Sequence, residues 1–184
     1  MLRRSTIVLW TLIVIWITSA PARAQGAPLR PSVTAGYQLL HIPDETFPLG
    51  FNIDVGVPIN GGWSGVAEAG FAHDNVNLTG STATSINFTN FGGGARWTGA
   101  TSANAAPFVQ LLVGGVHTSA NVSTVTATAH ASDTAFMIQP GIGVVVPATG
   151  MFAAVVQADY RRVFFSEEAE NEFRLFVGIR LAAR

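Results

Sequence analysis

The fold of this chain is decided by the segment Phe173-Arg174-Leu175-Phe176-Val177-Gly178-Ile179-Arg180-Leu181. Its odd positions are all large and apolar, whereas its even positions are Arg, Phe, Gly and Arg. A period of two predicts a β-strand with one apolar face and one mixed face. The apolar face would be the core of a soluble barrel or sandwich, but it would face lipid in a membrane barrel. The two interpretations give Arg174 and Arg180 opposite environments.

The first 24 residues have the pattern of a cleaved signal peptide. Arg3 and Arg4 precede an apolar run from Ile7 to Ile17, and Ala22-Arg23-Ala24 supplies the small residues of a cleavage site. The run is shorter than the ~20 apolar residues of a membrane-spanning helix. We therefore expect an exported protein with a signal peptide at 1–24, a short leader at 25–31 and one domain at 32–184. The chain has no cysteine, which excludes a lipoprotein and a disulfide scaffold.

Charged residues are too few for a soluble all-β domain of this size. They make up 11% of the chain, and lysine is absent, whereas soluble domains carry roughly 25%. So few charges cannot cover the exterior of a soluble domain, and we predict that the apolar strand faces contact lipid. The sequence also lacks a basic patch with interleaved aromatic residues, which argues against nucleic-acid binding.

Period-two alternation recurs eight times after the leader, and no stretch has a sustained helical period. Glycine, proline and asparagine separate the eight segments, as expected for turns and loops. The predicted strands are Ser32–His41, Leu49–Val57, Ser64–His73, Ser85–Trp97, Pro107–Thr118, Thr134–Val146, Met151–Val163 and Glu172–Leu181.

The connections between these strands are of two kinds. Tight or small ones follow the second, fourth and sixth strands, and longer acidic or Thr/Asn-rich ones follow the others. The longer ones are His41–Pro48, Asp74–Thr84, Ser119–Asp133 and Phe164–Asn171. Short periplasmic turns alternating with longer extracellular loops are typical of outer-membrane barrels. Aromatic residues predict two interfacial girdles, with Trp63, Trp97, Phe108 and Phe152 at the periplasmic ends and Phe47, Phe51, Phe71, Phe88, Phe136 and Phe164 at the outer ends.

With these features the mature chain resembles the small eight-stranded outer-membrane barrels of the OmpA and OmpX type, the outer membrane protein β-barrel domain group. The resemblance implies an all-β, eight-stranded, antiparallel up-and-down transmembrane barrel in the bacterial outer membrane. It also implies outer-membrane lipid or lipopolysaccharide and the barrel assembly machinery as partners, without a cofactor. Members of the group commonly end in an aromatic residue that the assembly machinery recognises, whereas this chain ends in Ala182-Ala183-Arg184.

If lipid lies outside, the second face of each strand lines a polar lumen. A hairpin centred near Gly61 sets Asp54 opposite Glu68, and a loop centred between residues 167 and 168 sets Arg161 near Arg174. Adjacent carboxylates need cations to stay charged, and arginine is the natural partner. We therefore predict a largely plugged lumen; the alternative is that the charges lie at different depths and contact water. The predicted network comprises Asp54, Glu68, Arg96, Asp159, Arg161, Arg174 and Arg180.

One segment, His117-Thr118-Ser119, suggests an enzyme. It resembles the His-x-Ser of the lipid A 3-O-deacylases, which are also eight-stranded outer-membrane barrels. The resemblance implies His117 as general base and Ser119 as nucleophile, with Asp133 as a possible third member where that family uses a glutamate. The simpler interpretation is a polar residue at a strand end. The four histidines lack metal-ligand spacing, so no metal site is predicted.

We interpret the chain as a non-enzymatic outer-membrane barrel with a structural, adhesive or binding role through its extracellular loops. The acidic stretch 167–172 is interpreted as a solvated loop. A lipid A deacylase-like hydrolase and a soluble, lipocalin-like periplasmic binder are the alternatives.

Overall fold

The computed structural model describes residues 30–42, 45–78, 82–100, 105–123, 128–165 and 169–183. The predicted signal peptide at 1–24 lies outside these residues, as do most of the leader, Glu167 and Glu168. No helix in the described part of the chain is long and apolar enough to cross a membrane.

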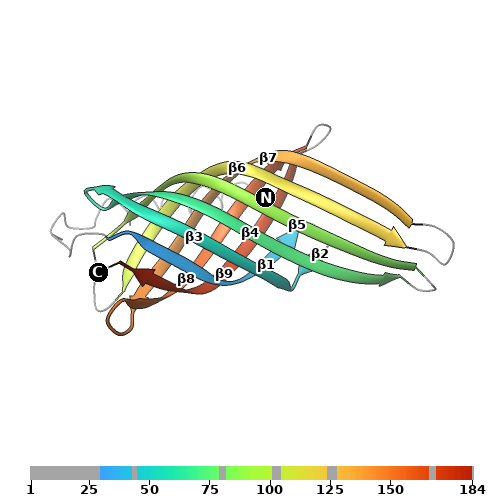
Figure 1. The fold of residues 1–184 in the computed structure, drawn as a ribbon. Coiled ribbons are helices and arrows are strands. Elements are labelled where there is room, and N and C mark those ends of the chain that lie inside the picture. Colours follow the sequence, from blue (N-terminus) through green and yellow to red (C-terminus); the bar gives the residue numbers. More distant parts are fainter. Residues whose placement is uncertain are drawn as a thin grey trace, which may run out of the picture.

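Consecutive antiparallel strands form a closed barrel (Figure 1). The barrel closes where β9 pairs with β1, and β2 is a short strand that pairs only with β1. The predicted eight-stranded up-and-down barrel is confirmed. The strands are β1 (Ser32–Ile42), β2 (Glu45–Phe47), β3 (Leu49–Asn60), β4 (Trp63–Leu78), β5 (Thr82–Thr98), β6 (Ala106–Ser123), β7 (Thr128–Pro147), β8 (Phe152–Phe164) and β9 (Ala169–Ala182).

One circuit of the barrel shifts the register by ten residues. The register partners of Leu40, taken strand by strand, are Arg174, Asp159, Gly141, Gln110, Arg96, Ser64 and Pro58. Extending the β1–β3 register from the Ser32–Gly56 pair places Pro58 opposite Arg30, ten residues before Leu40. In an eight-stranded barrel such a stagger tilts the strands by about 40° and leaves an interior that side chains fill.

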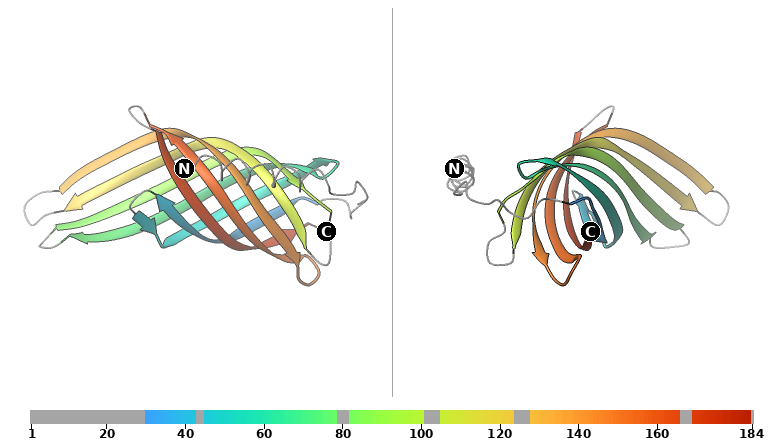
Figure 2. Two further views of the ribbon diagram at one scale, coloured as in Figure 1. Left: turned by 180° about the vertical axis from the view of Figure 1, so that it is seen from behind. Right: turned by 60° about the vertical axis from the view of Figure 1, so that its left-hand side comes forward.

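The two ends of the barrel differ. At one end, the turn end, β3 joins β4 through Gly61 and Gly62, both of which have positive φ, and β7 joins β8 through the short segment 148–151. At the other, the loop end, strands β4 to β7 run well past their neighbours (Figure 2). His73 is the residue of β4 nearest the loop end that still pairs with β3. Phe136 is the residue of β7 nearest the loop end that still pairs with β8. Residues 74–78 and 128–135 are therefore the outer edges of a four-stranded sheet that projects from the barrel.

The predicted loops Asp74–Thr84 and Ser119–Asp133 are consequently wrong over most of their length, because strand residues occupy them. These stretches are rich in Thr, Ser, Asn and Ala, and their only apolar residues larger than alanine are Val76, Leu78, Val122 and Val125, too few to give the alternation of a lipid-contacting strand. Backbone pairing continues where that alternation stops.

Successive side chains alternate between the outside of the barrel and its lumen. Large apolar residues cover the outside, among them Phe51 at 53% exposure and Val177 at 57%. Three aromatic residues assigned to the girdles, Phe47, Phe88 and Phe108, instead lie inside the barrel and are almost fully buried. Distance from a strand end predicts how deep a residue lies in the membrane, but the face of the sheet on which it lies depends on whether its position is odd or even. Trp63 and Phe152 at the turn end, and Phe51, Phe71, Phe136 and Phe164 nearer the loop end, do face outward.

Candidate functional site

The described inward side chains form three layers along the barrel. The inward side chains of β8 show the order, because Val155 is followed by Gln157, Asp159 and Arg161 and then by Val163. The polar middle layer lies between two apolar clusters. The turn-end cluster contains Ala106, Phe108, Val145, Val155 and Phe176. The loop-end cluster contains Leu40, Phe47, Ala72, Phe88, Val116, Ala135, Met137 and Val163.

Arg174 is the centre of the polar layer. Its guanidinium donates to both oxygens of Glu68, with Nη1–Oε1 at 2.7 Å and Nη2–Oε2 at 2.8 Å. The same group forms an ion pair with Asp159, with Nη2–Oδ2 at 2.8 Å. The three side chains are fully buried. Arg174 on β9 thus joins β8 to β4 across the lumen, and two carboxylates share one cation.

A second ion pair lies nearer the turn end. Arg96 holds Asp54 through two contacts, of 3.2 Å and 3.3 Å. Arg96 also donates to Oε1 of Gln110, whose amide nitrogen donates to Asp159 at 3.2 Å. Gln110 therefore links the Arg96–Asp54 pair to Arg174 in one continuous hydrogen-bonded network. The register sets Asp54 directly opposite Glu68, as the position of the turn predicts.

The third ion pair joins Arg161 to Glu172, with Nη1–Oε2 at 3.1 Å. Arg161 also donates to Gln139, which in turn donates to Glu68. The register pairs Arg161 with Glu172 and Arg174 with Asp159, so Arg161 lies near Arg174, diagonally across the two strands, but the two arginines are not direct partners. Glu172 was assigned to a solvated loop, yet it is only 1% exposed. Glu172 directly precedes Phe173 and shares the even register of Arg174, and this position in the sequence predicts that its side chain faces the lumen.

Arg180 is the network residue that the structure places apart. Its Nε donates to Oγ1 of Thr34 at 3.2 Å, and none of the described carboxylates forms an ion pair with it. Its guanidinium lies 5.8 Å from the ring centre of Phe108, and that of Arg96 lies 4.8 Å from the same centre. Both cations therefore contact one aromatic ring in the turn-end cluster.

Glycine makes room for the network. A Cβ atom at Gly141 would collide with Oδ1 of Asp159, and one at Gly70 would lie 2.6 Å from the side-chain oxygens of Asn52 and Asn90. Both positions face the lumen beside polar side chains, so a larger residue would displace them.

The structure does not assemble the three residues of the possible catalytic set. His117 is opposite Thr134, and its Nδ1 lies 2.8 Å from the Thr134 hydroxyl. Asp133 is opposite Thr118 and therefore lies on the other face of the sheet from His117 and Ser119. The Asp133 carboxylate accepts a hydrogen bond from the backbone of Thr134. Among the described residues, no cluster of His, Asp or Glu could hold a metal ion.

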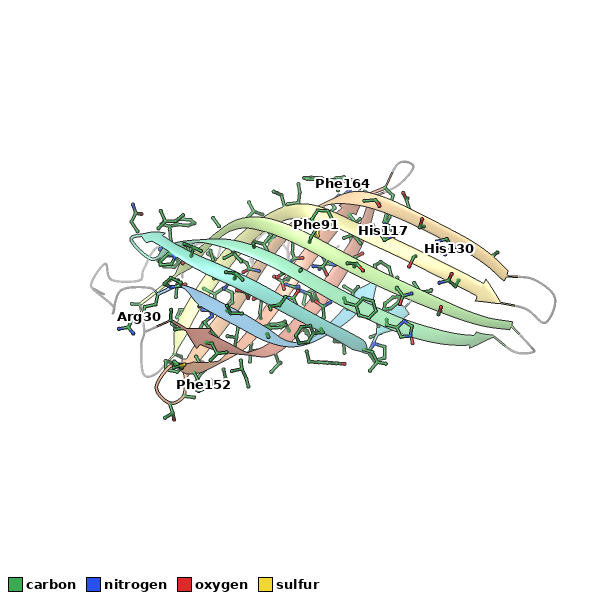
Figure 3. All side chains as sticks on the ribbon, viewed as in Figure 1. Arg30, Phe91, His117, His130, Phe152 and Phe164 are labelled. Carbon is green, nitrogen blue, oxygen red and sulfur yellow. The ribbon has the colours of Figure 1, made fainter. Side chains whose placement is uncertain are left out.

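The chemistry of the polar layer suits structural cross-linking. Buried charges are costly unless they are paired and hydrogen-bonded. Arg96, Arg161 and Arg174 each contact at least one carboxylate and one glutamine. Arg96 and Arg174 connect strands that are not neighbours, whereas Arg161 on β8 contacts its two neighbours, β7 and β9. Figure 3 shows the side chains that fill the barrel between its walls.

A model of the outer membrane protein beta-barrel domain family matches residues 10–180 of the chain. No curated protein sequence is similar enough to match. Among solved structures, the chain is similar to Ail, the attachment invasion locus protein of Yersinia pestis, at 15% identity and a TM-score of 0.60, over 84% of this chain and 99% of that one. Neisserial surface protein A is similar at 12% identity and a TM-score of 0.61, over 83% and 96%. The N-terminal β-barrel domain of Pseudomonas aeruginosa OprF is similar at 18% identity and a TM-score of 0.50, over 83% and 98%.

Proposed function

The chain belongs to the outer membrane protein β-barrel domain family, and from this premise we propose that it is a non-enzymatic barrel that acts at the cell surface and whose lumen is closed. Export would use residues 1–24 as a cleaved signal peptide. The turn end would then face the periplasm and the loop end the exterior, because outer-membrane barrels have short periplasmic turns.

Closure of the lumen is supported by its three layers. Phe47 and Phe108 are almost fully buried in the two apolar clusters, and the ion pairs of Arg174, Arg96 and Arg161 occupy the space between. An eight-stranded barrel has only enough interior space for its own side chains.

The observation that carries the surface role is the projecting sheet. Among the described residues, residues 128–135 of β7 have a strand partner only on the β6 side, and one backbone group of this stretch, the Thr134 N–H, donates to the Asp133 carboxylate. This edge contains Asp133 and no proline, lysine or arginine. Natural proteins usually protect such edges, and an unprotected edge can add an extended chain as a further strand. The proposed partner is therefore an extended segment of an extracellular protein. Ail, which is named for attachment, shares the fold.

The test compares two lysine substitutions at register partners. Ala131 lies on the edge strand β7, and its partner Ala120 lies on β6, which has neighbours on both sides. Lysine is the charged residue that natural edge strands use most to hinder further pairing. Cells that display Ala131→Lys should adhere less to a panel of immobilised extracellular proteins than cells that display the unchanged chain or Ala120→Lys.

A second variant shortens the edge to residues 132–135 without introducing a charge. Replacing residues 120–131 by Asn-Gly joins the register partners Ser119 and Ser132 through a two-residue hairpin turn. Adhesion should fall while the barrel still migrates differently on heating in detergent. Equal adhesion of the shortened and unchanged chains would contradict the proposed role of the sheet.

A further inference from the structure

Ionisable side chains are sorted by sign between the two faces of the barrel wall. The described strand carboxylates all occupy inward register positions, namely Glu45, Asp54, Glu68, Asp74, Asp133, Asp159, Glu170 and Glu172. The outward positions hold only basic groups besides tyrosine, namely His41, His73, His117, His130 and Arg162. Among the described strand residues, the outer surface therefore bears no negative side chain, although the chain as a whole has a net charge of −1.

Four of these basic residues repeat one arrangement. Strands β1, β4, β6 and β8 run from the turn end to the loop end, and each carries one basic residue near the outer aromatic band. The side chain of each contacts a polar residue directly opposite on the next strand. The pairs are His41–Thr46 at 2.8 Å, His73–Asn87 at 2.7 Å, His117–Thr134 at 2.8 Å and Arg162–Asn171 at 3.4 Å. We call these four residues the basic belt.

Outward aromatic rings adjoin the belt. His73 stacks on Phe71 with ring centres 6.3 Å apart, and the Arg162 guanidinium lies 5.7 Å from the ring centre of Phe164. His41 is the register partner of Phe173. His117 lies two residues beyond Gly115, the register partner of both Phe91 and Phe136. Phe91 and His117 follow one another toward the loop end (Figure 3).

Aromatic residues gather where the hydrocarbon of a membrane meets its headgroups. The belt therefore lies at the headgroup level of the leaflet that surrounds the loop end. In each imidazole the sheet engages Nδ1, which leaves Nε2 for a partner outside the protein. A side chain already held in place loses less freedom when it binds a ligand.

We propose that the basic belt binds the phosphate groups of lipopolysaccharide in the outer leaflet. Phosphate oxygens accept hydrogen bonds from imidazolium and guanidinium groups. The four positions lie on alternate strands round the barrel, so the contacts would anchor it on all sides. This inference rests on the membrane orientation proposed above and is independent of the adhesive edge.

The test measures how much lipid A the purified barrel retains. The folded chain is reconstituted with bisphosphorylated lipid A, with dephosphorylated lipid A or with phosphatidylcholine, and retained lipid is counted by native mass spectrometry after transfer to detergent. The unchanged chain should retain bisphosphorylated lipid A in preference to the other two lipids. The triple variant His73→Gln, His117→Gln, Arg162→Gln should retain roughly tenfold less of it, a loss equivalent to about 1.4 kcal/mol.

His130→Gln is the matched control. His130 also faces outward and contacts the opposite residue Asn121 at 2.8 Å, but Asn121 lies four residues beyond His117, past the belt. This variant should retain lipid A as the unchanged chain does. Equal retention by the triple variant, or equal binding of dephosphorylated lipid A, would overturn the proposal. Heat-dependent migration verifies that each variant is folded. The variant with the shortened sheet should lose adhesion but retain as much lipid A as the unchanged chain, which separates this proposal from the adhesive role.

Discussion

At the scale of single residues, Arg174 forms more ion pairs than either of the other described lumen arginines that form them, Arg96 and Arg161. Its guanidinium is the ion-pair partner of both Glu68 and Asp159, and all three are buried. Removing one member of a buried pair is costly because the remaining charge stays in a medium of low polarity. We expect Arg174→Met to lower the free energy of unfolding by about 3–5 kcal/mol, measured by urea titration of the barrel in lipid vesicles.

The partners of Arg174 provide the control for this prediction. Adding Glu68→Gln and Asp159→Asn to Arg174→Met removes the unpaired charges and should restore most of the lost stability. An exchange of Glu68 and Arg174 should not, because it would place a new carboxylate beside Asp159. Glu170→Gln at the exposed rim should change stability by no more than about 0.5 kcal/mol. A triple variant as unstable as Arg174→Met would show that the pairing itself is not what stabilises the layer.

Gly141 tests whether the network needs the space beside it. Its missing side chain leaves room for the Asp159 carboxylate and for Gln110. Gly141→Ala should lower the unfolding free energy by about 1–3 kcal/mol, the usual cost of overpacking. Gly93→Ala is the matched control, since a Cβ there would meet its nearest atom at 3.5 Å. If the two variants are equally stable in the same urea titration, steric relief at Gly141 is not needed.

Strand periodicity predicts which residues enter the lumen, but it does not predict their partners. A period of two assigns Asp54, Glu68 and Arg174 to the inner face without any structure. Register depends on where each loop is centred, and moving the centre by one residue changes every cross-strand partner by two. Such a shift separates the expected Arg161–Arg174 pair from the observed Arg161–Glu172 pair. The register between β3 and β4 can be predicted from the sequence because Gly61 and Gly62 mark the centre of their turn.

At the scale of elements, β2 contributes a side chain to the loop-end cluster of the lumen. Its Phe47 is fully buried and packs edge-to-face on Phe88, with ring centres 4.8 Å apart. Sequence alone placed Phe47 in a loop and in the outer girdle, because a three-residue strand has no measurable period. The Phe47 side chain of β2 packs in the apolar loop-end cluster, which forms only when the other strands close into a barrel.

Phe47→Ala should therefore loosen β2 more than it destabilises the barrel. Truncating a buried phenylalanine removes about 3–5 kcal/mol of packing, and here the loss is confined to an element that pairs with β1 alone. Amide hydrogen exchange of residues 45–47 should become much faster while exchange in β6 is unchanged. Phe91→Ala, on the outer surface at 56% exposure, should leave β2 protected. Uniform loss of protection in Phe47→Ala would contradict the assignment of β2 as a local cap.

At the scale of the whole molecule, the barrel wall separates apolar lipid contacts on the outside from a densely paired interior. Composition predicts this separation, since 11% charged residues cannot cover a soluble surface. It does not predict that apolar clusters lie on both sides of the polar layer. That arrangement requires the tilt and stagger of the closed sheet, which bring Phe47, Phe88 and Val116 from different strands into one cluster.

Three layers in series imply that no single substitution opens a path for ions. In planar bilayers the unchanged barrel, Phe47→Ala and Arg174→Met should all be silent, because at least two filled layers remain in each. The combined variant Phe47→Ala, Phe108→Ala, Arg174→Met thins every layer and should conduct in discrete steps. Its heat-dependent migration establishes that the barrel is intact, and the double variants give intermediate cases if the triple variant does not fold. Steady conductance by the unchanged chain would contradict closure, since the side chains that fill the lumen must then leave a continuous aqueous path.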